Sequence, residues 1–156
     1  MIKWTPRLIR ARDFSNEAHD SVGHVRKYTR APYWKHTDEV AEIVSQVTDD
    51  EDVIIAAFHH DTVEDCQSIN PYYSIETIAE MFGDRAATFV FHLTDQYIPE
   101  NYPKWNRKIR KQKECERLGS TGPQVHTVKL GDLLSNTADI LKHDRNFANL
   151  YLREKD

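Results

Sequence analysis

The chain has 156 residues, of which 39% are hydrophobic and 29% are charged, and its formal net charge is −4. This length favours one domain with a core of its own, and the negative charge argues against nucleic-acid binding by the chain as a whole. Two distant cysteines without a CxxC spacing argue against a disulfide framework, and the sequence lacks the apolar run of a signal peptide or a membrane span, so we expect a cytoplasmic protein.

Glycine is scarce, and most segments repeat their apolar residues with the period of a helix, which predicts an all-α, single-domain bundle of about eight helices over residues 1–156. The predicted helices cover residues 14–22, 36–47, 49–66, 74–83, 84–96, 106–119, 123–144 and 146–155, and loops cover residues 26–34 and 68–74. Thr37 is the expected N-cap of the 36–47 helix, and its inward face is formed by Val40, Ile43, Val44 and Val47. Ser74 is the expected N-cap of the 74–83 helix, which ends at Gly83.

The segment FHHDTVED, residues 58–65, follows the apolar run VIIAA and brings two histidines and three acids to a helix end. Burying a charge costs several kcal/mol unless the charge is paired or binds a metal. His60 and Glu64 are four residues apart, as are Asp61 and Asp65, so the two pairs form one polar edge on a helix. His60 and Asp61 could both reach one metal ion if other segments completed its shell.

Two distant segments offer such ligands, namely His36 at the start of a helix and Asp132, which Asn136 follows one turn later. Two imidazoles and two carboxylates suit Mn²⁺ or Fe²⁺ with open water positions, whereas a structural zinc site is more often rich in sulfur and closed. A divalent ion held there would lower the pKa of a coordinated water. Glu64 could then act as general acid or base, and Asp65 could orient Glu64 or the water, which predicts hydrolysis of a phosphate ester or anhydride.

Other charged segments have simpler interpretations. A second His-Asp pair, His143-Asp144, lies at a helix-to-helix turn and is typical of a solvated helix end. Residues 104–113 hold six cations, which indicate a solvated helix face, a phosphate-steering surface or a nucleic-acid site, the last disfavoured by the net charge. If this helix borders the cleft, Arg107 or Lys111 would contact the distal phosphates.

Four segments, in this order, resemble the HD-domain phosphohydrolases, in particular the hydrolase domain of RelA/SpoT-type alarmone enzymes and their small stand-alone relatives. The segments are AHDSVGHVRKYTRAPYWKH, IIAAFHHDTVED, FGDRAATFVFHLTD and VKLGDLLSNT. The resemblance runs from about residue 13 to residue 150, and HDTVED followed by KLxDxxxN distinguishes this subgroup from HD proteins in general.

The resemblance implies a helical bundle around one Mn²⁺ and the removal of pyrophosphate from the 3′ position of guanosine tetra- or pentaphosphate. Carried over position by position, it implies the metal ligands His36, His60, Asp61 and Asp132. Glu64 and Asp65 correspond to the catalytic acidic pair. Substrate contacts correspond to Arg26 and Lys27, a basic pair that holds phosphates and lies against the base, and to Lys129 and Asn136 beside the metal.

The sequence departs from the usual family pattern at three places. Arg30-Ala31 stands where the family usually has Gly-Glu, Thr37 where it has proline, and Gly131 where it has alanine. The first two lie in the loop that shapes the base pocket, so a phosphatase acting on another nucleotide, such as a nucleoside monophosphate or NADPH, is the alternative. A non-catalytic module that binds or sequesters a nucleotide is a further alternative, which the intact acidic pair disfavours. The oligomeric state is open.

Overall fold

The computed structural model describes residues 1–155, which form nine α-helices and no β-strand in that range. The helices are α1 (Pro6–Ser21), α2 (Trp34–Ser45), α3 (Glu51–His59), α4 (Thr62–Cys66), α5 (Ile75–Phe82), α6 (Asp84–Leu93), α7 (Arg107–Gly119), α8 (Pro123–His143) and α9 (Arg145–Lys155). The all-α prediction is therefore confirmed. The assignment of residues 1–156 to one domain stays a prediction, and Asp156 lies outside the described residues.

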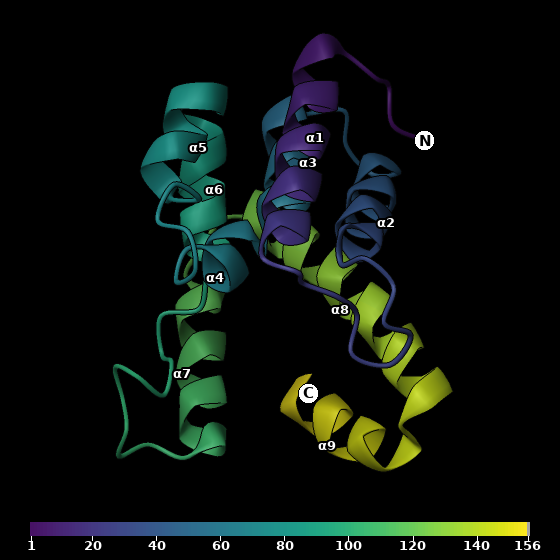
Figure 1. Ribbon diagram of the computed structural model, residues 1–156. Helices are drawn as coiled ribbons and strands as arrows, with labels where there is room; N and C mark the ends of the chain where they lie inside the picture. Colours follow the sequence, from purple (N-terminus) through teal and green to yellow (C-terminus); the bar gives the residue numbers. More distant parts are fainter. Residues whose placement is uncertain (156) are drawn as a thin grey trace.

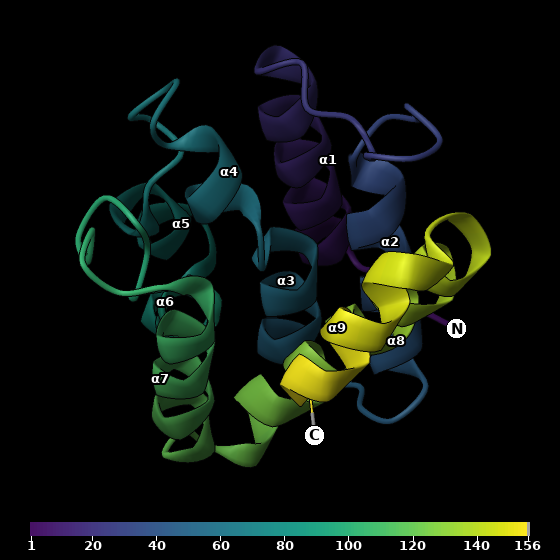
Figure 2. The same cartoon turned by 90° about the horizontal axis from the view of Figure 1, so that it is seen from below.

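Helix α3 is the centre of the bundle. All of its residues from Val53 to His59 are buried, because α1, α2, α6 and α8 pack around it (Figures 1 and 2). A helix that is apolar on every side needs such a position. The Ser15 hydroxyl of α1 donates a hydrogen bond to the carbonyl oxygen of Phe58 at 2.7 Å. The core therefore holds rigidly the helix end from which His60 and Asp61 follow.

A second, smaller cluster of buried apolar residues joins the end of α8 to α9. It consists of Ile140, Ala148 and Tyr151, with Tyr28, Leu133 and Phe147 packed against it. Helix α9 thereby folds back along α8, and its C-terminal end points toward α7 in both views (Figures 1 and 2).

None of the helices in residues 1–155 combines the length and the apolar character needed to cross a bilayer, and the cytoplasmic location stays a prediction.

The prediction of one helix over residues 49–66 is wrong, because the structure has two helices there with a break between them. Helix α3 ends at His59 and α4 begins at Thr62, so His60 and Asp61 lie in a break between them. Successive side chains of an unbroken helix diverge by about 100°, which would turn two adjacent ligands away from each other. The break allows both side chains to face the same point in space, and it accounts for the ninth helix.

The start of α2 also differs from the prediction. Helix α2 begins at Trp34, and Thr37 lies in its first turn, where its hydroxyl donates to the Trp34 carbonyl oxygen at 3.0 Å, so Thr37 is not the N-cap. Val47 lies beyond the end of α2 and is 74% exposed, not inward-facing as expected. The predicted cap of α5 is confirmed, since the Ser74 hydroxyl accepts a hydrogen bond from the Thr77 N–H at 3.2 Å.

The loop before α2 closes on itself through a bridge between Val25 and Pro32. Within it, Arg30 has φ 60°, the left-handed region in which glycine is favoured. The N–H of Arg26 donates to the Ala31 carbonyl oxygen at 2.8 Å. The closed loop fixes the backbone that leads into α2 and thus the position of His36.

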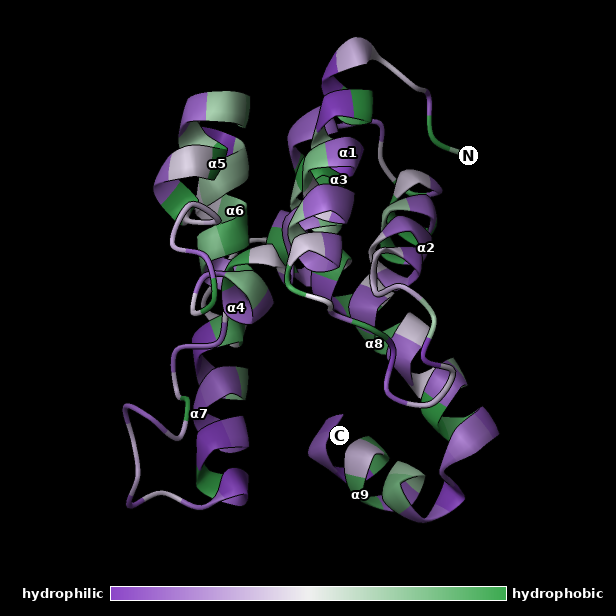
Figure 3. Cartoon of the chain, in the orientation of Figure 1, coloured by the Kyte–Doolittle hydropathy of each residue, from purple (hydrophilic) through white to green (hydrophobic). Residues whose placement is uncertain are grey.

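A buried carboxylate holds the segment between α6 and α7. Helix α7 is hydrophilic over most of its length (Figure 3), and Glu114 is its one buried residue. One oxygen of Glu114 accepts the N–H groups of Gln96 and Tyr97 at 2.6 Å each, and the other pairs with Arg117. Arg117 in turn donates to the His92 carbonyl oxygen at 2.8 Å, so this carboxylate ties α7 to the end of α6.

We expect Glu114→Ala to lower the free energy of unfolding by about 3 kcal/mol, because it leaves a half-buried arginine and two backbone N–H groups without their acceptor. Glu116→Ala is the matched control on the same helix, since Glu116 is 54% exposed and pairs with Lys113 at the surface. Its replacement should leave the free energy of unfolding unchanged within the error of the measurement. Urea denaturation followed by circular dichroism measures both, and equal losses in the two variants would contradict the structural role of Glu114.

Candidate metal centre and active site

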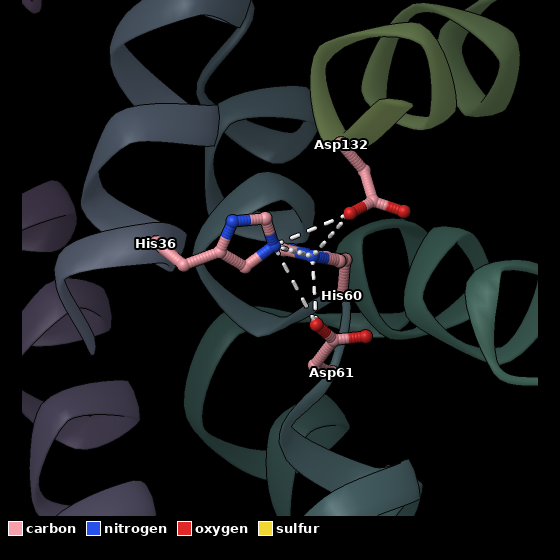
Figure 4. Close-up of side chains that lie close together, drawn as sticks. All are labelled: His36, His60, Asp61 and Asp132. Carbon is pink, nitrogen blue, oxygen red and sulfur yellow. Dashed lines mark hydrogen bonds and ion pairs between the residues drawn. The ribbon is translucent and has the colours of Figure 1, made fainter. Parts of the chain in front are cut away.

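Four predicted ligands from three segments of the chain converge in the core (Figure 4). His36 comes from α2, His60 and Asp61 from the break after α3, and Asp132 from α8. The Nε2 atoms of His36 and His60 are 3.3 Å apart. Oδ1 of Asp132 lies 3.2 Å from Nε2 of His36, and Oδ2 of Asp61 lies 3.0 Å from Nε2 of His60. One potential ligand atom from each side chain thus falls within 4.8 Å of every other.

The hydrogen bonds behind the two imidazoles fix which nitrogen carries a proton. Nδ1 of His60 lies 2.7 Å from the Ala57 carbonyl oxygen, which can only accept, so Nδ1–H donates. The Ser135 hydroxyl donates to Glu39 at 2.9 Å, so its oxygen accepts from Nδ1–H of His36, also at 2.9 Å. In the neutral rings both Nε2 atoms therefore present lone pairs to each other. Two facing lone pairs beside two carboxylates require a cation between them, which fits a divalent metal.

Without a metal, protons compensate this cluster. Burial alone would lower the pKa of His60, but Asp61 and Asp132 raise it well above its usual value. Burial would raise the pKa of Asp132, but Lys129 and the two histidines hold it well below its usual value. Lys129 contacts Oδ2 of Asp132 at 2.9 Å. Asn136 donates to its Oδ1 at 2.6 Å. Asp132 is thereby oriented with one oxygen toward the imidazoles.

The predicted acidic pair lies beside this cluster in a cavity of about 220 Å³. Glu64 keeps contact with solvent there, and its Oε1 accepts the N–H of Asp95 at 3.0 Å. Partial desolvation in the cavity and the charges of Asp61 and Asp95 raise the pKa of Glu64. Burial and the neighbouring Asp61 and Glu64 raise the pKa of Asp65 as well. Both carboxyls are therefore suited to carry and exchange a proton near neutral pH.

The predicted substrate contacts divide into two groups. Lys111, Lys129 and Asn136 line the cavity. The second group does not line the cavity and consists of Arg26, Lys27 and Arg107. Their contact with the substrate stays a prediction. Arg26 pairs with Asp139 at 2.8 Å, the ammonium of Lys27 lies 5.5 Å from the ring centre of Phe147, and Arg107 pairs with Glu154 at 2.7 Å.

The cavity also contains side chains that the sequence did not single out, namely Tyr33, Leu93, Asp95, Tyr151 and Lys155. The hydroxyl of Tyr33 donates to Oδ2 of Asp61 at 2.6 Å. Tyr33 precedes His36 by three residues, and Tyr151 and Lys155 are four apart, so helical spacing could have placed each beside a partner on one face. Spacing in the sequence could not have indicated Asp95, because its contact with Glu64 is made by its backbone N–H.

The fold and the His/Asp cluster define the class of protein. Residues 11–146 match the family described as HD domain, and the chain belongs to that family. Within it, the chain is related to the MESH1 and SpoT proteins. It is 32% identical over 139 residues to guanosine-3′,5′-bis(diphosphate) 3′-pyrophosphohydrolase MESH1 of Danio rerio, an alignment that covers 87% of this chain and 70% of that protein.

Other relatives agree with this grouping. The chain is 32% identical over 131 residues to the guanosine-3′,5′-bis(diphosphate) 3′-pyrophosphohydrolase of Aquifex aeolicus, covering 81% of this chain but only 17% of that longer protein. A solved structure, described as a metazoan orthologue of SpoT that hydrolyses ppGpp, superposes with a TM-score of 0.80 over 99% of this chain and 85% of that one. The two sequences are only 22% identical, and the superposition confirms the fold predicted from the resemblance.

We expect Asp61→Asn to weaken Mn²⁺ binding by about 100-fold or more, because loss of even an outer partner of a ligand costs about 10–100-fold. Asp144→Asn is the matched control from the second His-Asp pair, which lies at the turn into α9, and should leave the affinity unchanged. Isothermal titration calorimetry measures both variants. Equal affinity in wild type and Asp61→Asn would show that the ion binds elsewhere.

Metal binding should release protons near pH 7. The pKa of His60 is raised in the metal-free cluster, so its Nε2 must lose a proton before it can bind a metal. Protons therefore compete with the ion, and the affinity should fall as the pH is lowered. Calorimetry in buffers of different ionisation enthalpy measures the number of protons released. A binding enthalpy that does not depend on the buffer would contradict the protonated metal-free state.

Proposed function

We propose that the chain is a Mn²⁺-dependent hydrolase that removes pyrophosphate from the 3′ position of guanosine 3′,5′-bis(diphosphate) and related nucleotides. The observation that carries the proposal is the position of Glu64 and Asp65 in one cavity with His60, Asp61 and Asp132. The activity after which the MESH1 relatives are named supports the substrate class. Mn²⁺ is proposed because two imidazoles and two carboxylates suit it.

His36, His60, Asp61 and Asp132 would hold the ion, which when bound supplies Lewis acidity that acidifies a water and polarises a phosphoryl oxygen. In the overall reaction, a bond forms between the water oxygen and the 3′ phosphorus, and the bond from phosphorus to the ribose oxygen breaks. One proton leaves the water, and one reaches the ribose oxygen. Pyrophosphate and a free 3′ hydroxyl are the products.

Glu64 and Asp65 manage these protons. The N–H of Asp95 holds Oε1 of Glu64, while Oε2 makes no hydrogen bond within residues 1–155, so it is available to a water or to the leaving oxygen. Asp65 lies next to it in the cavity, and burial together with the charges of Asp61 and Glu64 raises its own pKa. Such proton transfer typically contributes about 10²–10⁴-fold to a rate.

Lys129 and Asn136 have a double role in this proposal. Both hold Asp132, and both line the cavity, so they can contact a phosphoryl oxygen beside the ion. Tyr33 donates a hydrogen bond to Asp61 and lines the same cavity. The cavity thus combines groups that would bind the ion with lysines that can contact a phosphate.

We expect Glu64→Gln to lower kcat for guanosine 3′,5′-bis(diphosphate) by about 100-fold or more, because the amide cannot take up or release the proton. Mn²⁺ affinity should be unchanged, since Glu64 is not in the four-ligand cluster. Glu80→Gln, on the exposed face of α5, is the control and should retain full activity. Full activity in Glu64→Gln would refute the assigned role.

The substrate class is tested by incubating the Mn²⁺-loaded protein with guanosine polyphosphates, nucleoside monophosphates and NADPH and identifying the products. Release of pyrophosphate from the guanosine polyphosphates supports the proposal. Release of orthophosphate from NADPH or a monophosphate would assign the chain to the other nucleotide phosphatases, and no release from any substrate would indicate a nucleotide-binding module.

A further inference from the structure

Three lysines from three helices line the same two adjoining cavities. They are Lys111 of α7, Lys129 of α8 and Lys155 of α9. The first cavity is the one that contains the acidic pair, and the second, of about 180 Å³, lies next to it and is also lined by Asp95. Residues shared by both cavities stand at their boundary. The three lysines therefore lie where the two cavities adjoin.

The carboxylates that line the second cavity each have a cationic partner, and two of the three lysines already pair with a carboxylate. Glu154 is held by Arg107 at 2.7 Å, and Glu114 by Arg117 at 2.7 Å. Lys129 pairs with Asp132, and Lys111 lies 3.5 Å from Asp95.

Lys155 differs from the other two lysines. No carboxylate within residues 1–155 lies within ion-pair distance of its ammonium, which instead lies 4.9 Å from the ring centre of Tyr151. Burial and the charges of Lys129 and Lys111 lower the pKa of Lys155. An anion placed among the three lysines would relieve this repulsion and give Lys155 an anionic partner, which it does not have among residues 1–155.

We propose that Lys155, with Lys111 and Lys129, binds the outer phosphate of the 3′ diphosphate, and so selects diphosphate over monophosphate groups. The inference rests on the proposed function. The inner phosphate, at which the bond to the ribose oxygen breaks, would lie at the metal cluster. The outer phosphate, bonded to neither the water nor the ribose, would lie among the lysines. The last turn of α9 is thereby part of the binding site.

Binding of inorganic pyrophosphate and of orthophosphate to the Mn²⁺-loaded 156-residue chain tests this inference by calorimetry. Pyrophosphate should bind at least about tenfold more tightly than orthophosphate, the equivalent of one added charged contact. Lys155→Ala should weaken pyrophosphate binding by about fivefold or more and change orthophosphate binding by less than about twofold. Lys155→Arg should restore most of the loss.

Lys108→Ala is the matched control, because it removes the same charge from an exposed position of α7 outside both cavities. It should leave both affinities unchanged. The inference is overturned if Lys155→Ala leaves pyrophosphate binding intact, if it weakens orthophosphate equally, or if Lys108→Ala has the same effect.

Steady-state kinetics separate this inference from the proposed function. With guanosine 3′,5′-bis(diphosphate), Lys155→Ala should raise KM by about fivefold or more and change kcat by less than about threefold. A loss in kcat at constant KM would overturn the binding role. If the wild type does not turn over this nucleotide, the proposed function fails, and pyrophosphate binding still decides the role of Lys155.

Discussion

The structure depends on two imidazole nitrogens that face each other in the core. Nε2 of His36 and Nε2 of His60 are 3.3 Å apart, and the hydrogen bonds from their Nδ1 atoms to Ser135 and Ala57 direct both lone pairs inward. Asp61 and Asp132 add negative charge at the same point. Such an arrangement is unfavourable without a positive charge at its centre, so the fold holds these groups together at a cost that a cation offsets.

This requirement explains why three segments meet where they do. Helix α2 carries His36, the break after α3 carries His60 and Asp61, and α8 carries Asp132. Gly131 allows the close approach of α8 to α2, because a Cβ atom there would lie 3.2 Å from a methyl group of Val44. The glycine at this position, which the family resemblance does not predict, therefore serves the packing of α8 next to Asp132.

The sequence predicted what depends on local spacing. Helical periodicity located most of the helices, and the adjacency of His60 and Asp61, together with Asn136 one turn after Asp132, indicated the ligand set. The sequence did not predict the break after His59, because the segment has good helical periodicity. The chain turns there only because His60 and Asp61 converge with His36 and Asp132, which are distant in the sequence. The cap of α2 was misplaced for a similar reason, since Tyr33 is held through its hydroxyl by Asp61, 28 residues away.

The ion-pair partners of Arg26 and Arg107 could not be predicted either. A sequence shows which residues are charged but not which of them meet in the fold. Arg26 pairs with Asp139, 113 residues away, and Arg107 pairs with Glu154, 47 residues away. Both pairs depend on how α8 and α9 fold back over the bundle. The basic stretch at 104–113 therefore contributes in two ways, with Arg107 joining α7 to α9 and Lys111 lining the cavity.

The charges of the cavity link metal binding to phosphate binding. Asp61, Glu64 and Asp65 form an acidic wall that would repel a phosphate, and Lys129 is partly neutralised by Asp132. A divalent ion bound by Asp61 and Asp132 would offset the acidic wall and weaken the hold of Asp132 on Lys129. The ammonium of Lys129 would then be available to a phosphoryl oxygen. Under the proposed function, the ion and the phosphate would therefore favour each other's binding, and the order that would cost least is the ion first and the nucleotide second.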